Sequence, residues 1–195
     1  MSALHEAKVA LRKRVLAARD AMPPSQRKLD SILLCGRLNA NIRYRRARAV
    51  LAYVGFGSEV DTEPFLKTVL ADGKVLALPR IDKARNVLTL YRVTDLAADL
   101  EPGPWGIREP SADPSRIFAL READFVLTPG LAFDAECNRM GYGKAYYDRL
   151  FADCPGAVPY RLALAFDCQV VDRVPVGTTD VQLDAVITPS REYSH

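Results

Sequence analysis

From residue 49 onward, the chain alternates short apolar runs with segments of helical spacing. The runs are largely apolar, as expected of strands that helices cover on both faces. They lie at residues 50–54, 75–78, 124–128, 162–166 and 185–188. Strands that alternate with helices in this way indicate a parallel sheet. We therefore expect an α/β fold, a three-layer sandwich in which a mostly parallel central sheet is flanked by helices.

A length of 195 residues is typical of one domain. We expect residues 1–195 to form a single α/β domain, with an N-terminal helical segment at 1–48 and the α/β core at 49–190. A basic N-terminal helix is predicted over residues 3–20 because apolar residues recur there at helical spacing. These residues are Leu4, Leu11, Val15 and Ala18.

Proline and small polar residues predict where further helices begin and end. Ser25 follows Pro23-Pro24 and is placed to cap a second helix. The apolar residues of this helix are Leu29, Ile32, Leu33 and Leu38. Thr62 is placed to cap a third helix, which has Pro64 in its first turn.

The remaining segments complete the predicted order of elements. Residues 87–93 alternate like a strand, the proline-rich segment 99–116 is expected to be a loop, and a helix is expected around 144–152. Ligands of open α/β sheets bind beyond the carboxyl ends of the strands. The segments that follow those ends are therefore expected to converge, and they begin at Gly55, Pro79, Pro129 and Asp167.

Positive charge is concentrated in the first quarter of the chain. Residues 1–48 hold 12 Lys and Arg against 3 acidic residues, whereas the whole chain has a net charge of only +3. Such a balance suggests a polyanionic partner or simply a solvated helical face. Nucleic acid is disfavoured because Tyr44 is the only aromatic residue in this segment available for base stacking. The remaining interpretation is that a few of these basic residues bind a phosphate group.

The sequence disfavours membrane insertion, secretion and histidine chemistry. No apolar run approaches the roughly 18 residues that span a bilayer, and the N-terminus has no apolar signal-peptide core. The four cysteines form no CxxC pair and are expected to be reduced thiols. The two histidines, His5 and His195, lie near the ends of the chain. We expect a cytoplasmic, monomeric protein without histidine-ligated metal.

The segment with the clearest chemistry is N-R-M-G-Y-G-K-A-Y-Y-D at residues 138–148. Gly141 and Gly143 let backbone N–H groups approach an anion closely. Arg139 supplies a forked donor suited to phosphate, and Lys144 is expected to enter a helix whose N-terminus adds positive potential. The segment therefore predicts a phosphate-binding loop, and the alternative is a plain glycine turn before an amphipathic helix.

Asp148 lies one helical turn beyond Lys144 in the sequence. A carboxylate on the same face as that lysine is placed to coordinate Mg²⁺ on a bound phosphate. The loop differs from the Walker A motif because G-x-x-x-x-G-K-[ST] is absent.

Residues 129–150 resemble the C-terminal signature of the 5-formyltetrahydrofolate cyclo-ligase family, also called methenyltetrahydrofolate synthetases. The similarity extends over nearly the whole chain, and the order and spacing of its segments make it specific. The other matching segments are Lys8-x-x-x-Arg12, Tyr53 with Glu59-Val-Asp-Thr62, Leu78-Pro79-Arg80, Trp105-Gly-Ile-Arg-Glu-Pro110, and Asp180 with Asp184.

The resemblance implies a reaction in which ATP phosphorylates the formyl oxygen of 5-formyltetrahydrofolate and N10 then attacks to form 5,10-methenyltetrahydrofolate. It implies ATP-binding roles for Lys8, Arg12, Arg139, Gly141, Tyr142, Gly143, Lys144 and Tyr147. It implies folate-binding roles for Tyr53, Glu59, Trp105 and Tyr146, and Mg²⁺ ligation by Asp148 and Asp180. Glu59, Arg139 and Lys144 are the residues expected to act directly on the reaction.

Two positions depart from the family pattern. Cys137 and Ala145 stand where the family usually has glycine. If position 145 needs a positive φ, alanine weakens the loop, whereas a helical φ makes alanine harmless. These departures leave a catalytically inactive folate- or nucleotide-binding relative as an alternative. A nucleic-acid-binding protein is a less favoured alternative, and a sugar-phosphate isomerase or acyl-transfer enzyme on a similar scaffold ranks last because no base is placed for it.

Overall fold

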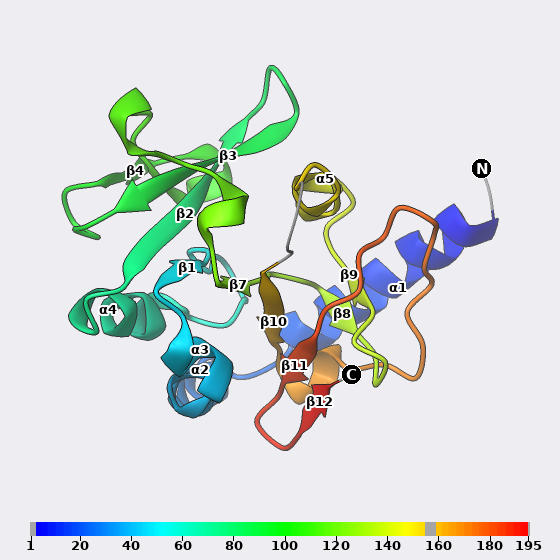
Figure 1. Cartoon of the computed structure of the whole chain (residues 1–195). Helices are drawn as coiled ribbons and strands as arrows, with labels where there is room; N and C mark the ends of the chain where they lie inside the picture. The colour runs from blue at the N-terminus through cyan, green and yellow to red at the C-terminus, as the bar shows by residue number, and fades with distance from the viewer. Residues whose placement is uncertain (1–2, 155–158, 195) are drawn as a thin grey trace.

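Within residues 3–154 and 159–194, the part of the chain that this computed structural model describes, an eight-stranded mixed sheet forms the centre of the fold (Figure 1). The strands from β11 to β2 pair in parallel, and the pairs at the two edges are antiparallel. The strand order is β12 (Glu192–Ser194), β11 (Ala185–Ile187), β10 (Tyr160–Leu164), β7 (Phe125–Leu127), β1 (Ala49–Leu51), β2 (Val75–Asp82), β3 (Val87–Val93) and β6 (Ile117–Phe118). The predicted α/β class with a mostly parallel sheet is confirmed.

Helices cover both faces of this sheet (Figure 1). The helices are α1 (Ala3–Asp20), α2 (Pro24–Ala40), α3 (Ile42–Arg46), α4 (Glu63–Ala71) and α5 (Tyr146–Ala152). Helices α2, α3 and α4 pack on one face, and α5 packs on the other. None of the helices within the described residues is long and apolar enough to cross a membrane.

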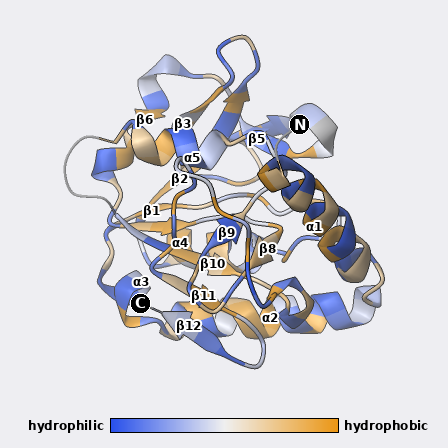
Figure 2. Cartoon of the chain, turned by 90° about the vertical axis from the view of Figure 1, so that its right-hand side faces the viewer, coloured by the Kyte–Doolittle hydropathy of each residue, from blue (hydrophilic) through white to orange (hydrophobic). Residues whose placement is uncertain are grey.

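Alternate residues of each short strand enter different cores, which explains the continuous apolar runs. In β1, Val50 packs under α2 and α4, whereas Ala49 and Leu51 pack under α5. In β2, Leu76 and Ala77 point to opposite faces in the same way. Hydrophobic residues accordingly dominate the central strands (Figure 2).

The predicted strands are confirmed in place and differ at their ends. The run at 50–54 forms a strand only to Leu51, because the chain then turns away from the sheet and Tyr53 directs its carbonyl to the Thr62 hydroxyl. The strand that begins at Val75 continues to Asp82, since it pairs antiparallel with β3 from Leu76 to Asp82.

The expected loop at 99–116 and the loop after β7 each contain a small two-stranded sheet. These sheets are β4 (Leu100–Pro102) with β5 (Arg108–Pro110), and β8 (Ala132–Phe133) with β9 (Arg139–Met140). Single turns of 3₁₀ helix also occur, at η1 (Pro104–Gly106), η2 (Pro114–Arg116), η3 (Leu120–Glu122) and η4 (Asp167–Gln169). Strands of two or three residues are too short to give a detectable alternation in the sequence.

The predicted apolar face of the second helix is wrong at three of its four residues, and only Leu38 is confirmed as buried. Leu29, Ile32 and Leu33 are 62%, 54% and 48% exposed, whereas the buried face consists of Ser31, Leu34, Cys35 and Leu38. Both sets have helical spacing, and the packing of α2 against the sheet selects the second.

The expected helix caps and part of the α1 stripe also differ from the prediction. Neither Ser25 nor Thr62 caps a helix with its side chain: Pro23 precedes α2, and the Thr62 hydroxyl bonds to the loop before it. In α1, Leu11 and Val15 are buried with Arg19, while Leu4 and Ala18 are exposed.

Three of the four segments expected to converge do so. Val54 and Pro129, beyond the carboxyl ends of β1 and β7, line one cavity together with Pro79, which lies within the longer strand β2. Asp167 does not line it, because the turn η4 after β10 packs against α1 and the Asp167 carboxylate accepts a hydrogen bond from Ser190.

Candidate active site

The cavity has a volume of about 760 Å³ and lies at the carboxyl ends of the parallel strands. It brings together nearly all the residues predicted from the sequence, from α1, the loop after β1, the segment after β9, α5 and the loop before β11. Those lining it are Lys8, Arg12, Tyr53, Glu59, Arg139, Gly141, Tyr142, Gly143, Lys144, Tyr146, Tyr147, Asp148 and Asp180. The Trp105 side chain lies outside what the structure describes.

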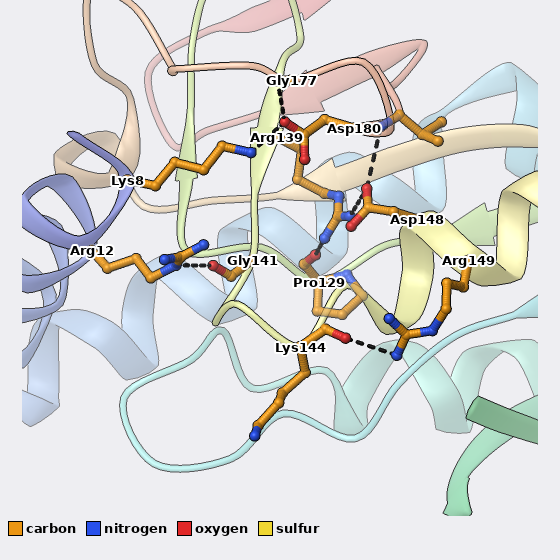
Figure 3. Close-up of polar contacts among 11 residues, drawn as sticks. Lys8, Arg12, Pro129, Arg139, Gly141, Lys144, Asp148, Arg149, Gly177 and Asp180 are labelled. Carbon is orange, nitrogen blue, oxygen red and sulfur yellow. Dashed lines mark hydrogen bonds and ion pairs between the residues drawn. The ribbon is translucent and has the colours of Figure 1, made fainter. Parts of the chain in front are cut away.

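The glycine loop, which we define as residues 141–145, is held against α1 by an arginine. The Nε atom of Arg12 donates to the Gly141 carbonyl oxygen at 2.9 Å (Figure 3). Gly143 has a φ of +97°, and a Cβ atom there would lie 3.2 Å from the Arg12 guanidinium carbon. A side chain at this position would therefore both strain the backbone and displace Arg12.

The start of α5 corrects one prediction. Lys144 lies before the helix, because the N-cap is Ala145 and α5 begins at Tyr146. Lys144 and Asp148 therefore do not share a helical face, although both line the cavity. No hydrogen bond or ion pair involves the Lys144 amino group within the described residues, so it lines the cavity without a partner of its own (Figure 3).

Both positions that replace a family glycine have left-handed backbone. Ala145 has a φ of +51° and Cys137 a φ of +61°. The Cys137 side chain is fully buried between β8 and the sheet, so its packing compensates for this strain, whereas Ala145 is exposed.

We expect Ala145→Gly to stabilise the protein by about 1 kcal/mol, because left-handed backbone costs an L-residue roughly 1–2 kcal/mol and glycine very little. Chemical denaturation measures the change in the free energy of unfolding. Cys137→Gly is the matched control, and it should lose stability because it removes a buried side chain. A loss of stability in Ala145→Gly would show that the alanine is unstrained.

Two ion pairs join cations and carboxylates at the cavity wall (Figure 3). The Arg139 guanidinium lies 2.7 Å from Asp148 Oδ1, with side-chain exposures of only 4% and 13%. Lys8 on α1 pairs with Asp180, whose Oδ2 also accepts the Gly177 N–H at 2.6 Å. Within the described residues, Arg139 Nε is buried without a hydrogen-bond partner.

Asp148 and Asp180 are the candidate residues for holding a magnesium ion beside a bound phosphate. Their hydrogen bonds within the described residues use Oδ1 of Asp148 and Oδ2 of Asp180, which leaves the second oxygen of each for a hard cation. No cluster of three or more His, Cys, Asp or Glu suited to a metal occurs in the described part of the chain. An ion here would need phosphate and water oxygens, which is how Mg²⁺ is usually held beside nucleotides.

Glu59 lies on the other side of the glycine loop. Its Oε1 accepts a hydrogen bond from the Tyr142 hydroxyl at 2.7 Å, and its Oε2 accepts the Phe56 N–H at 3.2 Å. Burial raises the pKa of the Glu59 carboxyl above its ordinary value, although Tyr142 and Arg19 oppose the rise. Burial therefore disfavours the ionised form of Glu59, and Tyr142 and Arg19 partly offset this effect.

Buried tyrosines form the floor of the cavity. Tyr53 and Tyr147 are 6% and 8% exposed, and burial raises the pKa of both hydroxyls. The Tyr147 hydroxyl has no hydrogen-bond partner within the described residues. Because buried polar groups are nearly always paired, this hydroxyl is placed to bind a ligand. Tyr146 is half-buried, and the Arg149 guanidinium lies 5.4 Å from its ring centroid.

Sequence reasoning missed two buried charged residues of the cavity. Arg19 is 2% exposed and lies on the apolar face of α1, four residues after Val15, which is an unusual place for a charge. Glu109 is also 2% exposed and accepts the Ile81 N–H at 3.2 Å, and burial raises the pKa of its carboxyl. It lies within the segment 105–110 that carried part of the resemblance, yet no role was assigned to it.

Comparison with known proteins agrees with this geometry. The sequence matches the 5-formyltetrahydrofolate cyclo-ligase family over residues 4–189. The chain belongs to this family. It is 30% identical to the mouse 5-formyltetrahydrofolate cyclo-ligase over 191 residues, covering 94% of each chain. It is 32% identical to the cyclo-ligase of Mycolicibacterium smegmatis over 186 residues, again covering 94% of each.

Solved structures of cyclo-ligases show the same fold. The 5,10-methenyltetrahydrofolate synthetase of Aquifex aeolicus superimposes with a TM-score of 0.83 at 32% identity, over 96% of this chain and 92% of that one. The synthetase from Mycoplasma pneumoniae superimposes with a TM-score of 0.73 at 21% identity, over 92% and 97%. The predicted family is thereby confirmed.

Proposed function

We propose that this cyclo-ligase converts 5-formyltetrahydrofolate and ATP into 5,10-methenyltetrahydrofolate, ADP and phosphate. The observation that carries the proposal is that one cavity contains both the glycine loop with its cations and the Glu59 side chain. The Tyr142–Glu59 hydrogen bond of 2.7 Å links the two. The proposed phosphate site and the proposed site for the formyl group that receives the phosphate therefore share one cavity.

The proposed reaction has two steps. The γ-phosphoryl group of ATP passes to the formyl oxygen, and ADP is released. N10 then attacks the formyl carbon and loses its proton, and phosphate leaves with the former formyl oxygen. Phosphoryl transfer depends mainly on positioning and charge neutralisation, which suits a site with cations and no histidine among its lining residues.

On the ATP side, cations and backbone would bind the phosphates. Lys144 lines the cavity and forms no ion pair within the described residues. The Nε atom of Arg139 has no hydrogen-bond partner there either. The residues proposed to bind ATP are Lys8, Arg12, Arg139, Gly141, Tyr142, Gly143, Lys144 and Tyr147. Asp148 and Asp180 would hold Mg²⁺, which when bound neutralises phosphate charge.

On the folate side, a carboxylate and aromatic rings would bind the substrate. Phosphorylation of the formyl oxygen places positive charge on the N5–carbon unit, and the Glu59 carboxylate is the group proposed to stabilise it. Tyr53 and Tyr146 line the same cavity and would contact the folate. Trp105 is proposed as a further wall from the sequence resemblance alone.

We also propose that residues 1–195 act as one catalytic domain, as a cytoplasmic monomer that binds neither nucleic acid nor membranes. The support for a single domain is a cavity whose walls come from α1 as well as from the α/β core. Because α1 contributes Lys8 and Arg12, part of the basic N-terminal charge serves the cavity.

The test is an absorbance assay with purified protein, 5-formyltetrahydrofolate and MgATP, following methenyltetrahydrofolate in the near ultraviolet. An increase that requires ATP is the expected result. A flat trace from folded protein that still binds ATP would overturn the proposal in favour of an inactive relative, and Ala145→Gly would then be the variant to examine for restored turnover.

Replacing Lys144 with Ala should raise the KM for ATP about tenfold, as expected for one lost bond to a charged phosphate. The free energy of unfolding should change by less than about 0.5 kcal/mol, because the side chain is exposed. Steady-state kinetics and denaturation measure the two effects. Lys13→Ala, an exposed change on α1 outside the cavity lining, is the control, and equal ATP dependence in both variants would exclude Lys144 from the site.

A further inference from the structure

An arginine lies on the buried, otherwise apolar face of α1, near the C-terminal end of the helix. Arg19 is 2% exposed and shares its helix face with the buried residues Leu11 and Val15. Burying a guanidinium is costly unless its N–H groups are paired, so its partners show what it does for the fold.

Its partners are two hydroxyl groups at the mouth of the cavity. Nε donates to Ser58 Oγ at 3.0 Å, and Nη2 donates to the Tyr142 hydroxyl at 2.7 Å. The guanidinium carbon lies 5.7 Å from the Tyr142 ring centroid. Nη1 is buried without a hydrogen-bond partner within the described residues. The Arg19 guanidinium thus has one nitrogen, Nη1, whose N–H groups still need a hydrogen-bond acceptor.

The Tyr142 hydroxyl connects Arg19 to Glu59 by hydrogen bonds. It accepts from Arg19 and therefore directs its own proton to Glu59 Oε1, 2.7 Å away. The Phe56 ring lies 5.8 Å from the Tyr142 ring, centroid to centroid, and packs beside this chain of hydrogen bonds. The glycine loop is consequently bonded directly to Glu59, and Arg19 of α1 is connected to Glu59 through Tyr142.

Four side chains from different elements set the electrostatic surroundings of Glu59. Arg19 on α1 is the cation, Tyr142 on the glycine loop is the donor, and the buried Tyr53 and Tyr147 are neutral at physiological pH. Arg19 is therefore the positive charge that favours the ionised carboxylate at this point.

We propose that Arg19 is a positioning residue for the cyclisation reaction, holding the Glu59 carboxylate in place through the Tyr142 hydroxyl. This inference rests on the proposed function, since it assigns Glu59 to the folate. It adds a residue of α1 to the folate half of the site, whereas the family resemblance implied ATP-binding roles for Lys8 and Arg12 of this helix.

The experiment compares Arg19→Met and Arg19→Lys with the wild-type protein. Arg19→Met should lower kcat/KM for 5-formyltetrahydrofolate roughly 10- to 100-fold, the range expected for losing a hydrogen bond to a charged group. The KM for ATP should stay within about twofold, because uniform damage to the fold would affect both substrates. Arg19→Lys keeps the charge and should recover part of the loss.

The pH profile separates positioning from a structural role. Removing the cation raises the pKa of Glu59, so the acid limb of kcat/KM should move to higher pH in Arg19→Met and return toward wild type in Arg19→Lys. Arg37→Met is the matched control: Arg37 donates to backbone carbonyls including Pro189, outside the cavity lining, and its loss should leave the profile unchanged.

Tyr142→Phe gives the same test without disturbing the Arg19–Ser58 bond. It removes the proton donated to Glu59 and should reproduce the shift, also if Arg19→Met fails to fold. Calorimetry measures the affinity for 5-formyltetrahydrofolate and so tests the inference independently of turnover. Arg19→Met and Tyr142→Phe should each weaken this affinity about tenfold. Unchanged pH profiles and folate affinities would overturn the inference, whereas absent wild-type turnover would count against the proposed function.

Discussion

Glu59→Gln is expected to lower kcat by about 100- to 1,000-fold, the effect typical of losing one group that stabilises transition-state charge. Glutamine has nearly the same shape but carries no charge to offset the positive N5–carbon unit. The absorbance assay with saturating MgATP measures this loss. An activity within threefold of wild type would show that the carboxylate charge is not needed.

The same substitution should make the folded protein more stable at neutral pH. Burial raises the pKa of Glu59 in the folded state, so folding favours the protonated form. The stability that Glu59 contributes is complete below its ordinary pKa and is lost as pH rises through the raised pKa. Glutamine mimics the protonated form and avoids this loss, so the advantage of Glu59→Gln should appear at neutral pH and vanish in acid.

Glu63→Gln is a matched control on the neighbouring helix. The Lys67 amino group, 2.8 Å away, lowers the pKa of Glu63, which reverses the sign of the expected stability change. This variant should be slightly less stable than wild type at neutral pH and fully active. Thermal melts across the pH range measure the stability change of both variants. A stability difference between Glu59→Gln and wild type that does not depend on pH would contradict the linkage argument.

The sheet was predictable from sequence because its central strands are buried on both faces. Val50 and Leu51 enter different cores, so no polar residue interrupts the run. The strand ends were not predictable, since an apolar residue such as Val54 continues the pattern while lining the cavity instead of joining the sheet. For α2, two stripes with helical spacing compete, and only packing against the sheet decides between them.

The site was predictable only where neighbouring residues carry the chemistry. Gly141, Gly143 and Lys144 lie together in the sequence and predict a phosphate loop directly. By contrast, Lys8 and Asp180 are 172 residues apart, and only the family resemblance linked them. Arg19 escaped both routes, because an arginine in a basic helix is normally a solvated charge.

The left-handed backbone at Ala145 was also beyond prediction. A residue before a helix adopts either helical or left-handed φ according to the path of the loop, and here Lys144 and Ala145 turn the chain into α5. The family glycine at this position therefore has a conformational reason, which the alanine of this chain meets at an energetic cost.

Arg139→Met is expected to lower the free energy of unfolding by about 3–5 kcal/mol, as typically found when one partner of a buried ion pair is removed. The variant leaves the Asp148 carboxylate, 13% exposed, with the Val181 N–H at 3.2 Å as its one remaining donor among the described residues. It also removes the bond from Arg139 to the Pro129 carbonyl oxygen. Chemical denaturation measures the loss, which MgATP cannot reverse if Arg139 binds phosphate.

A double variant distinguishes the cost of leaving the Asp148 charge buried and unpaired from the loss of side-chain packing. Arg139→Met combined with Asp148→Leu replaces both charges by apolar groups and should recover most of the stability, because an apolar pair pays no desolvation cost. The double variant should have no cyclo-ligase activity, since Arg139 and Asp148, both proposed to bind MgATP, are gone. Arg92→Met breaks the exposed pair with Glu122 and should cost at most about 1 kcal/mol. If Arg139→Met costs no more than Arg92→Met, the buried pair serves catalysis alone and contributes nothing to the fold.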